Sequence, residues 1–185
     1  GERSNASGIL SIALGADSDV KGVHAAALGQ GTKAFGNDSV AVGTRAQALA
    51  DYSTALGNQA TAAEKYDLAA GYNTIASGGQ STAVGYAARS TGNASNAIGG
   101  SSLAEGEYST AVGQEAHAKA GFTLAAGYMA KASGGQSTAV GSGSISTGNA
   151  ATAIGSSSLA AGDFSIALGQ ESKTAAGQSF ATALG

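Results

Sequence analysis

The chain has 185 residues, including 30 Gly and no Pro, Cys or Trp, and its formal net charge is −3. Aromatic residues make up only 5% of the chain and much of the apolar fraction is Ala, which leaves too few large side chains for a compact globular core. The absence of Cys excludes disulfides and thiolate metal sites. The apolar surface must therefore be buried in another way.

Charge and hydropathy limit the classes of partner that the chain can have. The basic residues are scattered singly, which argues against nucleic acid as a partner. No apolar run approaches the ~20 residues that span a bilayer, and no signal peptide opens the chain. We therefore expect no direct membrane insertion by this fragment. If the protein is exported, the chain is a mature fragment.

A strict 14-residue period organises the chain from its start. Two residues before each glycine of the period lies Ala, and the residue between them is Leu, Val or Ile in ten coils and Ala in two. Seven residues before the anchor glycine, nine of twelve positions are again Gly. Two glycine corners per coil predict two short strands per coil, and hence a β-solenoid. The anchor glycines are Gly15, Gly29, Gly43, Gly57, Gly71, Gly85, Gly99, Gly113, Gly127, Gly141, Gly155 and Gly169.

A coiled coil is the rival interpretation, because one 14-residue unit is as long as two heptads. It fails on residue type, since each interior Gly costs a helix about 1 kcal/mol relative to Ala. We predict one domain over residues 1–185, with about twelve 14-residue coils and an irregular last coil over 170–185. That last coil is two residues longer than the others, which indicates a loop insertion or a transition toward another segment.

In each coil the first strand is predicted to occupy the five residues before the anchor glycine, as in Gln80 to Val84. Alternation directs Ser81 and Ala83 inward, and the second strand repeats small inward residues such as Ala46 and Ala48. The interior is therefore expected to be lined by Ala, Ser and Gly. Outward sites of the second strand carry charge and are expected to be solvated: Lys33, Arg89, Lys119, Lys131 and Lys173.

The outward site beside the anchor glycine forms an aliphatic row. A stripe this long and apolar should not face water, so we expect identical chains to associate around it. The residues alone leave two, three or four chains open. The predicted interface residues are Leu14, Leu28, Val42, Leu56, Val84, Ile98, Val112, Val140, Ile154 and Leu168.

No catalytic, cofactor or metal site is predicted, and the chain is not expected to be an enzyme. His24 and His117 fall at different positions of the coil and are expected to be solvated. Asp67 is the one inward acid, with Lys65 close enough to help compensate its charge. Asn37 is predicted to lie in a turn at a second corner, where Gly and Asn tolerate positive φ.

Five aromatic residues share the place five residues before the anchor glycine. We interpret them either as edge-strand packing or as a surface that contacts a fibrous ligand. A repeat chain is expected to offer no unique pocket, so that binding is spread over weak, similar patches. The possible ligand-contact residues are Tyr52, Tyr66, Tyr108, Phe122 and Phe164.

The unit S-x-A-[VIL]-G-x-x-[SA]-x-A, as in Ser81 to Asn93 and Ser109 to Gly121, resembles the YadA-like head of trimeric autotransporter adhesins. The resemblance covers the chain from about Gly8 to Gly185. It implies an all-β solenoid, a left-handed parallel β-roll of 14-residue coils, assembled as a homotrimer. It also implies display on the outer membrane at the cell surface. Such proteins carry a neck, a stalk and a membrane anchor, so this chain resembles an excised head.

The function implied by that resemblance is adhesion to host cells or to extracellular matrix proteins such as collagen, fibronectin or laminin. The alternative is a structural trimeric fibre segment, of phage or pilus type, without specific adhesion. The residues alone do not decide which matrix ligand is bound or on which face.

Overall fold

The computed structural model describes residues 1–185, which divide into two compact units, residues 1–91 and residues 92–185. All of its regular elements are β-strands of two or three residues. It contains no helix with the length and apolar character needed to cross a bilayer. The predicted single domain over 1–185 stays a prediction.

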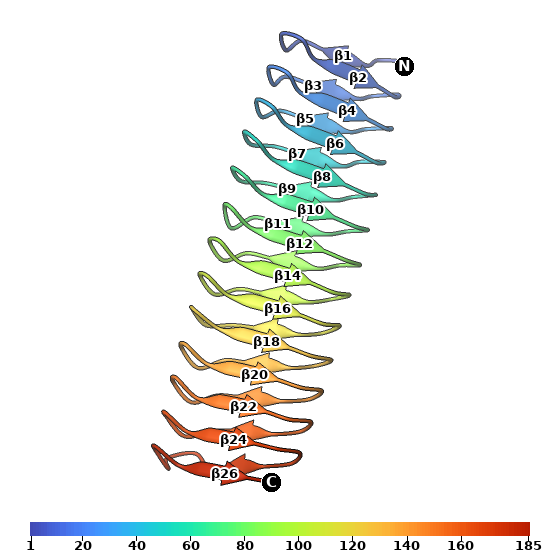
Figure 1. Cartoon of the computed structure of the whole chain (residues 1–185). Coiled ribbons are helices and arrows are strands. Elements are labelled where there is room, and N and C mark those ends of the chain that lie inside the picture. Colours follow the sequence, from blue (N-terminus) through green and yellow to red (C-terminus); the bar gives the residue numbers. More distant parts are fainter. The chain divides into compact units, whose positions relative to one another are not determined.

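In unit 1 the strands alternate between two parallel sheets, as Figure 1 shows. Each strand pairs with the strand two places along the chain at a 14-residue offset, as in Leu68 with Thr54 and Thr82. One sheet contains β1 (Asn5–Ala6), β3 (Asp19–Val20), β5 (Lys33–Ala34), β7 (Gln47–Ala48), β9 (Thr61–Ala62), β11 (Ile75–Ala76) and β13 (Arg89–Ser90). The other contains β2 (Ile12–Leu14), β4 (Ala26–Leu28), β6 (Val40–Val42), β8 (Thr54–Leu56), β10 (Leu68–Ala70) and β12 (Thr82–Val84).

Unit 2 repeats this arrangement with the same register, as in Thr110 with Leu124. One sheet contains β15 (Leu103–Ala104), β17 (His117–Ala118), β19 (Lys131–Ala132), β21 (Ile145–Ser146), β23 (Leu159–Ala160) and β25 (Lys173–Thr174). The other contains β14 (Asn96–Ile98), β16 (Thr110–Val112), β18 (Leu124–Ala126), β20 (Thr138–Val140), β22 (Thr152–Ile154), β24 (Ile166–Leu168) and β26 (Thr182–Leu184). Both units confirm the predicted parallel β-solenoid of 14-residue coils.

The interior of each coil is filled by small side chains. Ser81, Ala83, Ala46 and Ala48 are fully buried, as predicted. Many buried hydroxyls donate to the carbonyl three residues earlier, as Ser53 Oγ does to the Ala50 carbonyl at 2.6 Å. This bond satisfies a corner carbonyl that the short strands leave free of the sheet ladder. Small residues thus fill the core, and their hydroxyl groups satisfy carbonyl groups at the corners.

The strands are shorter than predicted. The even-numbered strands hold three residues rather than five, because the residue five before the anchor glycine lies in a left-handed turn, as in Tyr52 with φ 58° and Gln80 with φ 56°. A second left-handed residue follows two places after the anchor glycine, as in Arg45 with φ 59°. Backbone hydrogen bonds between neighbouring coils stabilise these turns. For example, Tyr52 N donates to the Asn37 carbonyl at 2.8 Å.

Glycine is required at the anchor position for two reasons. At Gly57 the backbone adopts φ +126°, a region that side-chain-bearing residues rarely enter. A Cβ built at Gly57 would also lie 2.3 Å from the carbonyl oxygen of Gly71 in the next coil. Close stacking of corner on corner therefore requires glycine at this position in coil after coil.

The extra residues of the last coil form a loop insertion. β26 pairs with β24 at an offset two residues longer than in the other coils, with Ile166 opposite Thr182 and Leu168 opposite Leu184. β25 keeps the 14-residue offset, Leu159 with Lys173. The two additional residues therefore lie between β25 and β26, where Gly177 takes φ +79° with open space around it. The sheet continues through the irregular coil, which supports the first of the two predicted interpretations.

Candidate functional site

The predicted interface residues end the even-numbered strands, and they line up in register within each unit. In unit 1 they are Leu14, Leu28, Val42, Leu56 and Val84, and in unit 2 they are Ile98, Val112, Val140, Ile154 and Leu168. Seven of these ten side chains belong to residues more than a third exposed, from 39% at Val112 to 54% at Leu14. Leu184, which the sequence analysis missed, extends the row at 76% exposure. Each unit thus presents an uncovered aliphatic row.

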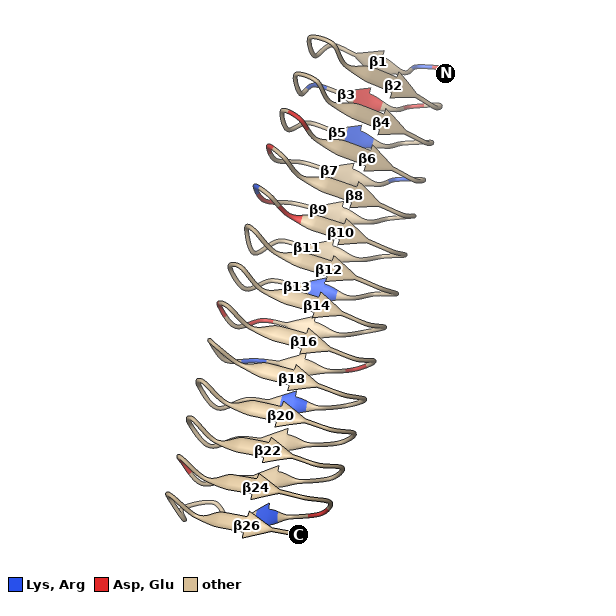
Figure 2. Ribbon diagram, in the orientation of Figure 1, with Lys and Arg blue, Asp and Glu red and all other residues tan.

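The two sheets differ in charge. Figure 2 shows the even-numbered strands without a charged residue, whereas Asp19, Lys33, Arg89, Lys131 and Lys173 open odd-numbered strands. Lys33, Arg89, Lys131 and Lys173 are exposed as predicted. Lys119 is exposed too, but it follows β17 rather than lying in it.

The predicted charged face is only partly charged. The same outward site holds the apolar side chains of Ile75, Leu103, Ile145 and Leu159, which are half-buried. A continuous strip without charge is therefore found only on the even-numbered strands.

The five predicted ligand-contact residues lie at the second corner and not on a strand face. They form ring stacks along the coils: Tyr52 with Tyr66 at 5.1 Å between ring centroids, and Tyr108 with Phe122 at 5.2 Å. Phe164 stacks at 5.0 Å with Phe180, which the 14-residue count missed because of the two inserted residues. The edge-strand interpretation is therefore wrong, and the rings are half-exposed turn residues.

A further stack occupies the other corner. The rings of Tyr72 and Tyr86, each one residue after an anchor glycine, lie 5.5 Å apart and nearly parallel. Sequence reasoning did not single out this pair. The signal was available, because two tyrosines separated by one full period must lie one above the other in stacked coils.

Lys65 does not compensate Asp67. Its ammonium lies over the rings of Tyr66 and Tyr52, 5.1 and 5.5 Å from their centroids, in a cation–π arrangement. The buried Asp67 carboxylate instead accepts hydrogen bonds from Glu64 N at 2.9 Å and from Ser81 N and Oγ at 2.9 and 2.8 Å. Neutral donors thus satisfy this acid, which contributes to the local structure of the corner.

The second corner also carries a polar ladder. Asn37 Oδ1 accepts from Val23 N at 3.0 Å, and Asn37 N donates to Asp51 Oδ1 at 2.8 Å. In unit 2, Asn149 repeats this role between Gly135 and Asp163. The predicted turn at Asn37 is confirmed, and the left-handed residue of this turn is the next one, Asp38. Asn and Asp occupy this position because their side-chain oxygens accept hydrogen bonds from backbone amides of the neighbouring coil.

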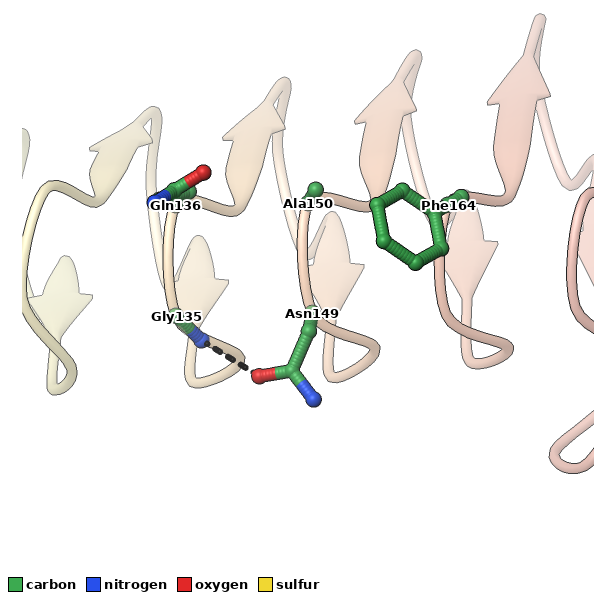
Figure 3. Close-up of a pocket in the computed structure, with 5 residues that line it drawn as sticks. All are labelled: Gly135, Gln136, Asn149, Ala150 and Phe164. Atoms are coloured by element: carbon green, nitrogen blue, oxygen red, sulfur yellow. Dashed lines mark hydrogen bonds between the residues drawn. The ribbon is translucent and has the colours of Figure 1, made fainter.

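The prediction that the chain offers no unique pocket stays a prediction. Unit 2 has an open recess of about 270 Å³, lined by Gly135, Gln136, Asn149, Ala150 and Phe164. Figure 3 shows the Phe164 ring on one side of Ala150 and the Gln136 amide on the other, with the Gly135 to Asn149 hydrogen bond below. The recess exists because Ala150 occupies a corner position that carries a ring in other coils.

The histidines each contact one carboxylate. His24 Nδ1 lies 3.3 Å from Asp38 Oδ1, and His117 Nε2 lies 2.9 Å from Glu105 Oε2. No group of three or more His, Cys, Asp or Glu could hold a metal ion. The exposed surfaces therefore offer apolar and aromatic contacts with single charged pairs.

Comparison with known proteins agrees with this geometry. A family model described as the YadA head domain repeat matches residues 21–46, 48–74, 62–88, 76–95, 90–116, 118–144 and 146–172. A search of the curated proteins finds no match. Among solved structures, the collagen-binding domain of the Yersinia adhesin YadA superposes with a TM-score of 0.51 at 24% identity, covering 91% of this chain and 69% of that one. At this identity the likeness shows the fold.

Proposed function

The chain belongs to the YadA head repeat family, and on that premise we propose that it is the head of a trimeric bacterial surface adhesin that binds collagen. The observation that carries the proposal is the uncharged, uncovered aliphatic row on a fold shared with a collagen-binding adhesin domain. Fibronectin and laminin stay predictions of the resemblance. Display at the outer membrane is part of this proposal.

The aliphatic row supports assembly from identical chains. Each leucine or valine side chain contributes about 1.5–3 kcal/mol when it is fully removed from water. Contiguous apolar stripes of this kind on a soluble chain mark interaction sites. A symmetric oligomer covers the same row in every copy, and the family resemblance favours three copies. The even-numbered strands are the interface in this proposal, and the odd-numbered strands and corners remain outside.

Adhesion would then use the outer corners and the odd-numbered strands. Similar patches recur in successive coils and, in a trimer, on each chain, so many weak contacts act together. Retention on a fibrous ligand would depend on this multiplicity, because linked weak sites bind far more strongly than one alone.

One set of variants tests assembly and adhesion together. We expect the wild-type chain to sediment as a trimer and to be retained on a collagen-coated surface. Val84→Asp combined with Val112→Asp places an unpaired carboxylate in each unit's apolar row, which costs several kcal/mol per chain when buried. This variant should dissociate or unfold and lose retention. Lys131→Asp, on an odd-numbered strand, should leave the sedimentation and the melting temperature unchanged.

The outcomes separate the parts of the proposal. A stable folded monomer of the wild-type chain would refute assembly through the row. Equal melting temperatures of the valine and lysine variants would show that the faces are assigned wrongly. A stable trimer that is not retained on collagen would refute collagen adhesion and favour the structural fibre segment.

A further inference from the structure

The second corner of unit 2 forms a column in which side chains of successive coils lie one above the other. Tyr108 and Phe122 stack at 5.2 Å with an interplanar angle of 20°, and Phe164 and Phe180 stack at 5.0 Å with an angle of 6°. The coil spacing itself, about 4.8 Å, sets this distance. The backbone thus holds aromatic rings in parallel, one coil apart, wherever the sequence supplies them.

The column is interrupted at Ala150. In Figure 3 the amide of Gln136, in the coil before, lies on one side of Ala150, and the ring of Phe164, in the coil after, lies on the other. Gln136 and Phe164 are two coils apart, or about 9.6 Å along the stack. Between these two residues the small methyl group of Ala150 leaves the place of one ring empty. The resulting recess has a volume of about 270 Å³.

The walls of the recess determine what fits it. Asn149 is already engaged, because its Oδ1 accepts from Gly135 N at 3.2 Å and its N and Nδ2 donate to Asp163 Oδ1 at 2.8 and 3.2 Å. The side-chain amide of Gln136 makes no hydrogen bond within the chain and is exposed. The site therefore combines one aromatic face, one methyl floor and a single free amide.

A planar ring suits these walls better than a sugar. Aromatic rings gain stabilisation from parallel stacking on another ring, and an amide plane can cover the second face. A pyranose carries several hydroxyl groups, and each one that loses water without gaining a partner weakens binding. One free amide cannot provide hydrogen-bond partners for several hydroxyl groups.

We propose that this recess binds an aromatic side chain, Phe or Tyr, of a partner polypeptide, which inserts between Gln136 and Phe164 and restores the missing ring of the column. The ring would lie about one coil spacing above Phe164, as Phe164 itself lies above Phe180. This site does not depend on collagen adhesion, so it can bind a ring even if that function is refuted.

The test uses the assembled protein with 13C-labelled alanine methyls and 15N-labelled glutamine side chains, titrated with N-acetyl-L-phenylalaninamide in NMR spectra. We expect a saturable upfield shift of the Ala150 methyl, because a stacked ring shields it, and a shift of the Gln136 amide. N-acetyl-cyclohexylalaninamide has a similar size without a planar ring and should bind at least about fivefold more weakly. Methyl β-glucopyranoside should cause no saturable shift.

Variants test whether the ring binds in the recess at Ala150. Ala150→Phe fills the recess with the protein's own ring and should weaken the Gln136 response at least about tenfold. Ser157→Phe is the matched control, because Ser157 is an exposed left-handed residue with φ 56° at the opposite corner, and it should bind as the wild type does. Phe164→Leu keeps bulk and removes the ring, so it should also weaken binding.

Several outcomes would overturn the proposal. They are no saturable shift at Ala150, equal binding of the cyclohexyl compound, a stronger response to the glucopyranoside, or unchanged binding in both Ala150→Phe and Phe164→Leu. If Ala150→Phe alters the circular dichroism spectrum, Phe164→Leu alone decides. Loss of collagen retention with intact ring binding would refute the proposed function and leave this site standing.

Discussion

The two corners of each coil both turn through left-handed residues and differ in what they require of the sequence. At the first corner the anchor glycine adopts φ between +117° at Gly169 and +137° at Gly127, and a Cβ would meet the next coil's backbone. At the second corner Gly36 has no positive φ, although a Cβ there would lie 2.0 Å from the carbonyl carbon and oxygen of Ala50. The chain places Ala50, Glu64 and Ala120 at that position but never replaces an anchor glycine.

This difference shows where the chain can vary. The first corner needs both a special backbone conformation and space, so only glycine satisfies it. The second corner needs space alone, and the chain itself places Ala50, Glu64 and Ala120 at this position. The larger set of ring stacks, the Asn and Asp ladder and the recess at Ala150 all lie at the second corner. We therefore expect partners to bind at the second corner, while the first corner keeps the same backbone conformation in every coil.

The largest effect is expected when one methyl group is added at each corner. Gly57→Ala forces both a strained φ and a contact of 2.3 Å with the Gly71 carbonyl oxygen, and should destabilise each chain by about 2–5 kcal/mol. Gly36→Ala meets only the steric contact and should cost about 1–3 kcal/mol. Chemical denaturation followed by circular dichroism measures both. Equal losses would mean that backbone conformation does not distinguish the corners.

A second change concerns the buried acid of the second corner. Asp67→Ala leaves the amides of Glu64 and Ser81 without their acceptor in the interior, and should cost about 2–3 kcal/mol. Ser53→Ala, at the same position one coil earlier, removes one bond to the Ala50 carbonyl and should cost about 1 kcal/mol. Urea denaturation compares the two. A smaller loss for Asp67→Ala than for Ser53→Ala would show that the carboxylate is not stabilising.

The smallest expected effect is at the ring stacks. Tyr108→Ala removes the ring that stacks on Phe122 and should lower stability by about 0.5–1.5 kcal/mol. Its effect on collagen retention should be slight, because contacts recur along the coils. Tyr86→Ala, which removes a stack at the first corner, is the control. Complete loss of retention in a folded Tyr108→Ala trimer would mean that adhesion depends on one discrete site.

The period, the parallel coils and the inward Ala and Ser can be predicted from the sequence, because each depends on a residue type repeated at a fixed spacing. Ala46, Ser81 and Ala83 are buried where alternation placed them. It could also have indicated the left-handed turn positions, since none of the residues there is Val, Ile or Thr, which are the least compatible with positive φ.

Tertiary structure decided what depends on contacts between coils. The pairing of Phe164 with Phe180 follows from where the last coil absorbs its two extra residues, which the anchor spacing does not reveal. The position of Lys65 over tyrosine rings rather than beside Asp67 depends on how the corner turns. The recess at Ala150 is an empty place between neighbours one coil away on either side. A linear pattern records which residues are present, whereas such a space is created only when three coils stack.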